Sequence, residues 1–226
     1  MKVQLLEHTP NPERLVSAAA KVCYSASPAC SLYEGLNDEE AKRFLDRLGH
    51  ESPLEHVSFT FAIDGVSRSL THQLVRHRMA SFSQKSQRYV DEKSFEYVTP
   101  PEIESNAILK ENYEKIMTSA MFNYDMLQDR LMKLGRTKEQ ACEDARYVLP
   151  NACSSNIVVT MNARELLHFF SVRCCNRAQW EIRNLADEML RICRVIAPVL
   201  FKNAGADCVN GRGCGEGIMS CGRPRK

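Results

Sequence analysis

The sequence predicts an α+β fold, in which a small antiparallel sheet of short strands is flanked by helices. Two segments, residues 57–63 and 154–161, are rich in β-branched and aromatic residues, as strands commonly are. Several other segments carry apolar residues at every third or fourth position, which is typical of amphipathic helices. One of these patterns continues from residue 103 to 134, so we expect one very long helix.

The overall composition indicates an ordinary globular protein. The chain has 226 residues, of which 44% are hydrophobic, and its 30 basic and 28 acidic side chains leave a net charge of +2. This balance disfavours a surface that binds nucleic acid or membrane as a whole. We find no signal peptide and no apolar run near the roughly 18 residues of a membrane span. We therefore expect a cytoplasmic protein whose cysteines are mostly reduced thiols.

In the N-terminal half, short strands and helices alternate. Residues 2–6 predict a strand, and a helix then covers about residues 12–24. Asn37 or Asp38 caps the next helix, which ends near residue 49. Phe59 and Phe61 then share one side of the half-buried strand at residues 57–63, and Asp64-Gly65 ends it.

A helix is expected after this break, because Val66, Leu70 and Leu74 repeat every four residues. Four polar residues fall on another face of the same helix, so their side chains are expected to point into one space. They are Ser69, Gln73, Arg76 and His77.

Helices also dominate the C-terminal half. Thr137, with Gln140 three residues later, matches a capping box that would begin a helix after the long one. The strand at residues 154–161 follows, and the last helix covers residues 178–203. Residues 205–226 are rich in glycine and cysteine and cannot build a core, so we expect a domain at 1–204 and a flexible basic tail at 205–226.

The tail leaves one alternative open. Its three cysteines, Cys208, Cys214 and Cys221, could bind zinc with a fourth ligand. Their spacing contains no CxxC pair, however, which favours a flexible tail over a metal site.

The segment from Arg76 to Tyr89 is the most distinctive in the chain. It contains five basic side chains, three serines and two glutamines but no aspartate or glutamate. A core segment would not collect so many polar groups, since each one needs a partner when buried. The pattern favours a site for an anionic ligand that bears phosphate. A solvated basic loop explains the composition alone equally well.

A second anion site is predicted where a helix begins at Asn162. The free N–H groups and the dipole of a helix start favour an anion, and Arg164 adds a positive charge. Glu165, three residues after Asn162, completes the pattern of a capping box. The alternative is a plain capped helix without a ligand.

Five motifs, taken in order, resemble those of the flavin-dependent thymidylate synthases. Arg-His-Arg is followed after seven residues by serine, which is the signature of that family. The resemblance covers about residues 1–200, and its motifs are Gly49 to His56, Arg76-His77-Arg78 with Ser86 and Arg88, Arg146 to Pro150, Asn162-Ala163-Arg164, and Arg173 with Ala178 to Ile182.

The resemblance implies a reaction and an assembly. The reaction is reductive methylation of dUMP to dTMP, with the methylene from methylenetetrahydrofolate and the electrons from NADPH through FAD. The assembly is a homotetramer with active sites shared between subunits. No cysteine lies within Arg76 to Arg88, and none has an evident base partner in the sequence, so we expect no cysteine nucleophile.

The resemblance also implies which residues form the site. Arg173 is the expected catalytic residue, because a guanidinium at the uracil edge would stabilise negative charge developing on the ring. His50 would lie near the folate and flavin rings. FAD would be bound by Ser52, Arg76, His77, Arg78, Gln84, Asn162, Ala163, Arg164 and His168. The residues for dUMP would be Gln73, Arg76, Gln84, Ser86, Arg88, Arg146 and Arg173.

Three of the expected positions differ from the usual pattern of the family. Gln84 stands where an acidic residue is common, His168 where asparagine is frequent, and Arg177 where histidine is often found. Gln84 can still form hydrogen bonds, but it supplies no charge.

Two other classes of function are alternatives to the enzyme that the resemblance implies. A nucleic-acid-binding module could use Arg76 to Arg88 on phosphates, but the near-zero net charge and the second anion site at Asn162 argue against it. A purely structural assembly protein would leave the polar stripe at Gln73, Arg76 and His77 unexplained.

Overall fold

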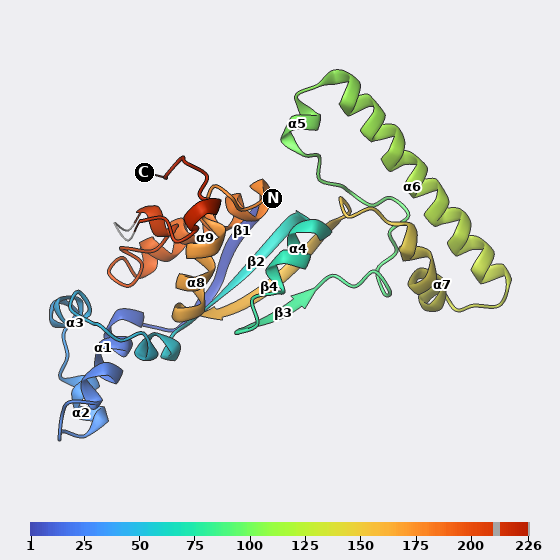
Figure 1. Ribbon diagram of the computed structural model, residues 1–226. Coiled ribbons are helices and arrows are strands. Elements are labelled where there is room, and N and C mark those ends of the chain that lie inside the picture. The colour runs from blue at the N-terminus through green and yellow to red at the C-terminus, as the bar shows by residue number, and fades with distance from the viewer. Residues whose placement is uncertain (210–212, 226) are drawn as a thin grey trace. The chain divides into compact units, whose positions relative to one another are not determined.

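The structure contains one four-stranded sheet among the residues that it describes. The computed structural model describes residues 1–209 and 213–225. The strand order is β1-β2-β4-β3 (Figure 1), which confirms the predicted α+β class with a small antiparallel sheet. The strands are β1 (Lys2–His8), β2 (Ser58–Ser67), β3 (Ala80–Gln84) and β4 (Ser154–Asn162).

The register of the two central strands can be followed in their side chains. The hydroxyl oxygens of Thr60 and Thr160 lie 2.9 Å apart, and farther along the pair Gly65 N donates to Asn156 Oδ1 at 3.3 Å. Phe59, Phe61 and every second residue around them on β2 are buried, as the alternation in the sequence predicts.

The chain divides into two compact units, to which β2 and β4 both contribute residues. Unit 1 comprises residues 1–2, 63–73 and 83–157. Unit 2 comprises residues 3–62, 74–82 and 158–226.

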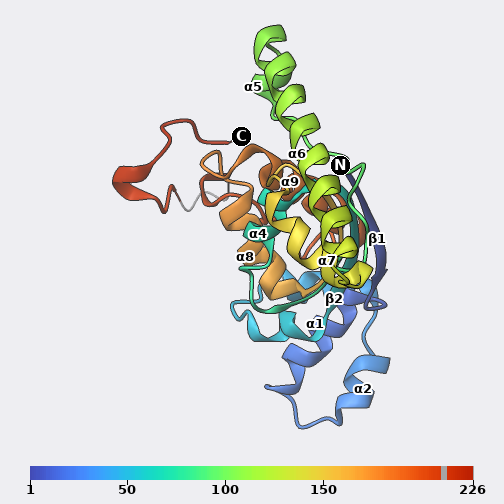
Figure 2. The same cartoon turned by 90° about the vertical axis from the view of Figure 1, so that its right-hand side faces the viewer.

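In unit 1 the long helix α6 (Ala107–Lys133) packs against α7 (Lys138–Ala145), as Figures 1 and 2 show. The long helix is shorter than predicted, because Asn106 adopts an extended conformation and its side chain accepts from Ile108 N and Leu109 N. This cap separates α6 from the short α5 (Pro101–Glu104).

The start of α7 confirms the predicted capping box. Thr137 Oγ1 accepts from Gln140 N, and Gln140 Oε1 accepts from Thr137 N. The helix is followed directly by the 3-10 turn η2 (Arg146–Val148). Arg146 therefore caps the C-terminal end of α7.

In unit 2 helices surround an aromatic core. Phe201 is fully buried, and its ring lies edge-on to Phe59 at 5.5 Å and to Phe170 at 6.0 Å. The helices α8 and α9 contact each other, as do α1 and α3. Unit 2 contains α1 (Pro12–Val22), α2 (Ala29–Glu34), α3 (Asp38–Leu45), η1 (Ser52–His56), α8 (Ala163–Arg173), α9 (Trp180–Ile196), η3 (Asp207–Val209) and η4 (Gly217–Met219).

The structure corrects the prediction around the basic segment. Strand β2 continues through Asp64-Gly65, and α4 (Arg68–Leu74) ends before Arg76 and His77. Gly65 has φ +69°, which lets the chain pass this point without breaking the strand. The predicted helical stripe that would include Arg76 and His77 is therefore wrong.

The described part of the tail belongs to unit 2 and contacts α9 and the cap residue at the C-terminal end of α8. Arg225 Nη1 donates to Asp187 Oδ1 and to Cys174 O, each at 2.7 Å, and Cys208 Sγ accepts from Arg225 N. The flexibility expected of residues 205–226 stays a prediction, and positions 210–212 and 226 lie outside the described residues. None of the described helices combines the length and the apolar character that crossing a membrane requires.

We predict that Phe201→Ala destabilises the protein by about 3–5 kcal/mol, because it removes two ring contacts and leaves a cavity in the core of unit 2. Urea unfolding measures this change. Tyr24→Ala, at an exposed aromatic of the same unit, is the control and should stay within about 0.5 kcal/mol of wild type. Equal losses in the two variants would contradict this description of the core.

Candidate active site

A cavity of about 750 Å³ lies in unit 2. Among its lining residues are three of those expected to bind FAD, namely Asn162, Arg164 and His168, together with His50. Ser52 opens η1 between the lining residues Glu51 and Leu54 but does not itself line the cavity. The cavity therefore brings the helix start at Asn162 together with the His50 turn, two segments separated by more than 100 residues in the sequence.

The start of α8 is built by Asn162, as predicted. Its Oδ1 accepts from Glu165 N at 2.8 Å, and the next residue, Ala163, donates its N–H to Val57 O at 2.9 Å. These two bonds tie the first turn of α8 to the chain that leads into β2. The result is a rigid helix start at the wall of the cavity.

Arg164 lies at the rim of this cavity with two acidic neighbours. Its guanidinium forms an ion pair with Glu55, and its Nε lies 3.6 Å from Glu51 Oε2. Glu55 is the main reason that the pKa of Arg164 is raised. All three side chains are half exposed, so these ion pairs are weak and a bound anion can compete with them.

The buried side chain of His77 forms hydrogen bonds with two other polar side chains, Glu165 and Arg173. His77 Nδ1 lies 3.1 Å from Glu165 Oε1, and Arg173 Nε donates to His77 Nε2 at 3.1 Å. The ring of His77 is 5.8 Å from that of His168 and stands edge-on to Phe169 at 5.0 Å. The structure thus brings together His77, His168 and Arg173, which were predicted from separate motifs.

The surroundings of His77 lower its pKa and so favour the neutral ring. Burial is the main cause that lowers the pKa of His77; Arg173 lowers it further, while Glu165 opposes the shift. The pKa of Arg173 is also lowered, first by burial and then by Arg76, which places a second positive charge nearby. Arg173 is the last residue of α8, yet its Nε bonds to a histidine rather than to a helix carbonyl.

In unit 1 the end of β3 is held by Gln84. Its Nε2 donates to Thr71 Oγ1 at 3.0 Å and to Ser155 Oγ at 3.1 Å. The amide at this position therefore joins α4 to β4 inside the unit. An acidic side chain there would need the two hydroxyls to turn and donate instead.

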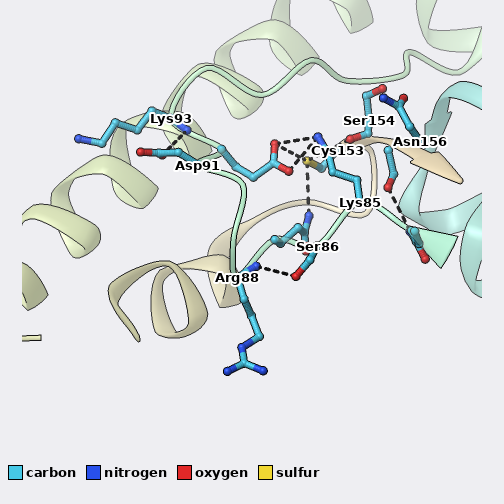
Figure 3. Close-up of polar contacts among 12 residues, drawn as sticks. Lys85, Ser86, Arg88, Asp91, Lys93, Cys153, Ser154 and Asn156 are labelled. Carbon is cyan, nitrogen blue, oxygen red and sulfur yellow. Dashed lines mark hydrogen bonds and ion pairs between the residues drawn. The ribbon is translucent and has the colours of Figure 1, made fainter. Parts of the chain in front are cut away.

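The segment after β3 is anchored by a buried carboxylate (Figure 3). Lys85 Nζ lies 2.8 Å from Glu92 Oε1, and the carboxylate of Glu92 is only 3% exposed. Gln87 Nε2 contacts Cys153 Sγ at 3.6 Å, and Ser86 Oγ accepts from Arg88 N at 3.3 Å. A buried ion pair of this kind fixes the path of the segment, since breaking it would leave an unpaired charge in the interior.

The remaining residues expected at dUMP also lie in unit 1. Arg88 Nη2 is 3.3 Å from Glu143 Oε2 and 3.5 Å from Glu139 Oε1, both on α7. Arg146 caps the same helix, and Gln73 Nε2 donates to Ser69 O at 3.3 Å on α4. Arg88 and Arg146 are therefore both attached to α7.

The two units divide the predicted residues between them. Gln73, Gln84, Ser86, Arg88 and Arg146 belong to unit 1. Unit 2 holds the others: Ser52, Arg76, His77, Arg78, Asn162, Ala163, Arg164, His168 and Arg173.

Two acidic residues were not singled out as site residues from the sequence. The sequence predicts Glu165 only as part of a helix cap, and no motif in it includes Glu92. Glutamate is common at the third position after a helix cap. Its presence at position 165 therefore does not predict the pairing with His77. Lys85 and Glu92 are seven residues apart in a segment without regular secondary structure. No periodic pattern in the sequence therefore predicts their ion pair.

We predict that Cys153 resists alkylation in the folded protein. Burial, and next the charge of Glu92, raise its pKa to about 11, so very little thiolate exists at pH 8. Iodoacetamide labelling read by peptide mass spectrometry should modify Cys153 at least about 100-fold more slowly than the exposed Cys23 and Cys30. Unfolding should remove the difference, and equal labelling in the folded state would contradict this placement.

Known proteins match this chain over almost its whole length. The family described as thymidylate synthase complementing protein (Thy1) matches residues 4–199. The flavin-dependent thymidylate synthase of Clostridium tetani is 53% identical over 234 residues, covering 99% of this chain and 94% of that protein. Those of Nitratidesulfovibrio vulgaris and Geobacter sulfurreducens are 52% and 48% identical, covering 98% and 99% of this chain and 94% of each relative.

These matches span both units and all five motifs rather than a single signature. Identities near one half extend over almost the whole chain, which is far above the level that shows common family membership. The chain therefore belongs to the flavin-dependent thymidylate synthases, a family of methyltransferase-type enzymes.

Proposed function

We propose that the protein converts dUMP to dTMP by reductive methylation, with methylenetetrahydrofolate as carbon donor and with NADPH as the source of electrons through FAD. The observation that carries the proposal is the buried cluster at the end of α8. There a permanently charged guanidinium, Arg173, is held by hydrogen bonding to the histidine of the Arg76-His77-Arg78 motif. Family membership supplies the reaction class.

The cavity in unit 2 fits a flavin nucleotide. Its volume of about 750 Å³ lies within the range of small-molecule sites, roughly 300–1,000 Å³. The rigid start of α8 and the half-exposed Arg164 suit a pyrophosphate, while His50 and His168 offer ring surfaces. When bound, FAD would supply the hydride that reduces the transferred carbon.

The residues of unit 1 suit the nucleotide. Ser86, Arg88 and Arg146 offer a hydroxyl and two guanidinium groups, the donors that a phosphate prefers. Arg88 is paired with Glu139 and Glu143 in exposed positions, so a phosphate dianion can take their place at small cost. Gln73 can both donate and accept at the edge of a uracil ring.

Arg173 is the group that we assign to the chemistry. The uracil ring becomes reactive at carbon only when its electrons are redistributed and negative charge develops on the ring. A guanidinium keeps its proton at any working pH and places positive charge where that charge develops. Neighbouring Arg76 strengthens the positive potential, as its influence on the pKa of Arg173 indicates.

A cysteine nucleophile is not part of the proposal. Burial raises the pKa of Cys153 to about 11 and that of Cys174 to about 12, and it raises the pKa of Cys193 as well. Thiols in such surroundings remain protonated and inert near neutral pH. Activation of the uracil by Arg173 requires no covalent bond to the enzyme.

We further propose that the protein acts as a homotetramer with shared sites. Helix α6 exposes several large apolar side chains, including Ile108, Ile116 and Phe122, which are 72%, 60% and 68% exposed. Exposed apolar residues concentrated on one long helix are typical of a surface that other subunits cover.

The reaction is tested with the purified protein. We expect it to be yellow, or to become yellow with added FAD, and to form dTMP from dUMP, methylenetetrahydrofolate and NADPH. A colourless protein that cannot be loaded with FAD would refute the proposal, and so would a loaded protein that forms no dTMP.

The role of Arg173 is tested by Arg173→Ala. We expect flavin content, melting temperature and flavin reduction by NADPH to stay near wild type, while dTMP formation falls by roughly 100- to 1,000-fold, the scale for one lost electrostatic contact. Arg191→Ala, an exposed arginine of α9, is the matched control and should stay active. Early melting, or near-normal turnover with saturating dUMP, would show that Arg173 only ends α8.

The assembly is tested by Phe122→Glu, which places a charge on the exposed apolar surface of α6. We expect light scattering to report a smaller particle than wild type and dTMP formation to fall with it. Phe122→Leu keeps an apolar side chain and should assemble normally. If the Phe122→Glu variant has the same particle mass as wild type, the proposal that α6 forms the subunit interface is wrong.

A further inference from the structure

We propose that Glu165 is a positioning residue, which acts through His77 to hold the guanidinium of Arg173 in its working orientation. This inference rests on the proposed function of Arg173. It adds a residue that is far from Arg173 along α8 and that makes no direct contact with it in the described structure. All three residues belong to unit 2.

The geometry is a continuous hydrogen-bonded chain. Glu165 lies in the first turn of α8 and Arg173 is its last residue, so their backbones are about 12 Å apart along the helix axis. His77, from the segment after α4, bridges this distance. One of its ring nitrogens meets Glu165 Oε1 at 3.1 Å, and the other meets Arg173 Nε at 3.1 Å.

The roles of the two nitrogens follow from the partners. A guanidinium has only N–H donors and no acceptor, so His77 Nε2 must present its lone pair to Arg173. The single proton of the neutral ring then sits on Nδ1 and is donated to Glu165. The carboxylate therefore selects the one tautomer that can hold Arg173, and its negative charge makes Nε2 a stronger acceptor.

The surroundings support this state. His77 is buried, and the edge of Phe169 restricts its ring. The charged or titratable groups that act most strongly on its pKa are Glu165 and His168 on α8 and Arg173 at the end of that helix. Burial, Arg173 and His168 favour the neutral ring, while the carboxylate of Glu165 opposes them; the N–H that Arg173 donates to Nε2 leaves no proton on that nitrogen, as the tautomer argument requires.

A simple capping role does not account for Glu165. In a full capping box the third residue returns its side chain to the backbone N–H of the cap, as Gln140 does at the start of α7. At α8 only the Asn162 half of that pattern is made, and the carboxylate of Glu165 is directed to His77 instead. Its side chain is 11% exposed, which is costly for a carboxylate without such a partner.

The consequence is a defined position for the reactive end of Arg173. The bond to His77 uses Nε, so the two Nη groups remain for the uracil edge. Without Glu165, the imidazole can place its proton on Nε2 and then repels the guanidinium. Arg173 would keep its charge but lose its fixed direction, and a small misplacement of such a group lowers the rate.

The first test compares Glu165→Ala with Glu165→Gln. The amide oxygen of glutamine can still accept from Nδ1, so this variant should keep most of the dTMP-forming activity. The alanine variant should lose about ten-fold in kcat, the scale for groups that orient a ligand through another residue, with flavin content unchanged. Glu188→Ala, an exposed glutamate of α9, is the matched control. In an Arg173→Ala background, Glu165→Ala should cause no further loss.

The second test does not depend on activity. In protein labelled with nitrogen-15 at histidine, wild-type His77 should show a protonated Nδ1 and an unprotonated Nε2, assigned by comparison with His77→Asn. Glu165→Gln should retain this signature and Glu165→Ala should lose it. A wild-type His77 with its proton on Nε2, or an alanine variant with normal turnover, would overturn the inference. Equal losses in both Glu165 variants, together with early melting, would also overturn it by showing a role in folding alone.

The two levels of the proposal separate cleanly. If wild type forms no dTMP, the proposed function fails, whatever the state of His77. If wild type forms dTMP and the imidazole spectrum does not respond to Glu165→Ala, the positioning role fails and the proposed function stands.

Discussion

The packing of one face of α8 into the core of unit 2 is the constraint on which the site depends. Leu166, Phe169 and Phe170 are fully buried, and Phe170 contacts the ring of Phe201. Because this apolar face cannot turn without opening the core, the polar residues of the same helix are fixed in space. Arg164 and His168 reach the cavity, while Glu165 meets His77. Hydrophobic burial thus sets the geometry of groups that are themselves polar.

A related principle holds in unit 1, although its anchor is a buried ion pair rather than an apolar face. Lys85 and Glu92 hold the ends of the segment that contains Ser86 and Arg88. A buried charge pair contributes little net stability, since desolvation offsets most of the attraction. It does favour one path of the chain strongly, because any other path leaves a charge unpaired. That selectivity suits the role that we propose for this segment, which is to present donors to a phosphate.

Burying polar groups at this candidate site costs free energy of desolvation. His77 and Arg173 are drawn out of water far enough to lower the pKa of both. The protein tolerates this burial because each group has a directional partner, and together they form one connected chain. The cysteines follow the opposite rule. Cys153 and Cys193 are buried thiols with raised pKa values, so they stay protonated and fill space in the core.

Local sequence signals are sufficient to predict most of the strands and helices and the residues that cap them. The alternation at Phe59 and Phe61, the cap at Asn162 and the capping box at Thr137 each depend on neighbours within a few positions, so they were readable in advance. The same reasoning failed after Leu74, because the polar spacing of Gln73, Arg76 and His77 predicts a helix that in the structure ends at Leu74. Such spacing is compatible with a helix without requiring one, and tertiary contacts decide where it ends.

What only the tertiary structure decided is which distant side chains meet. The family resemblance of the motifs predicts Arg173 and His77 as site residues, but it contains no distance between positions almost 100 residues apart. Glu165 had two possible uses in the sequence, a backbone cap or a side-chain partner. The choice between them depends on what lies beside the first turn of α8 once its apolar face is buried. That neighbour is His77, and long-range packing alone brings it there.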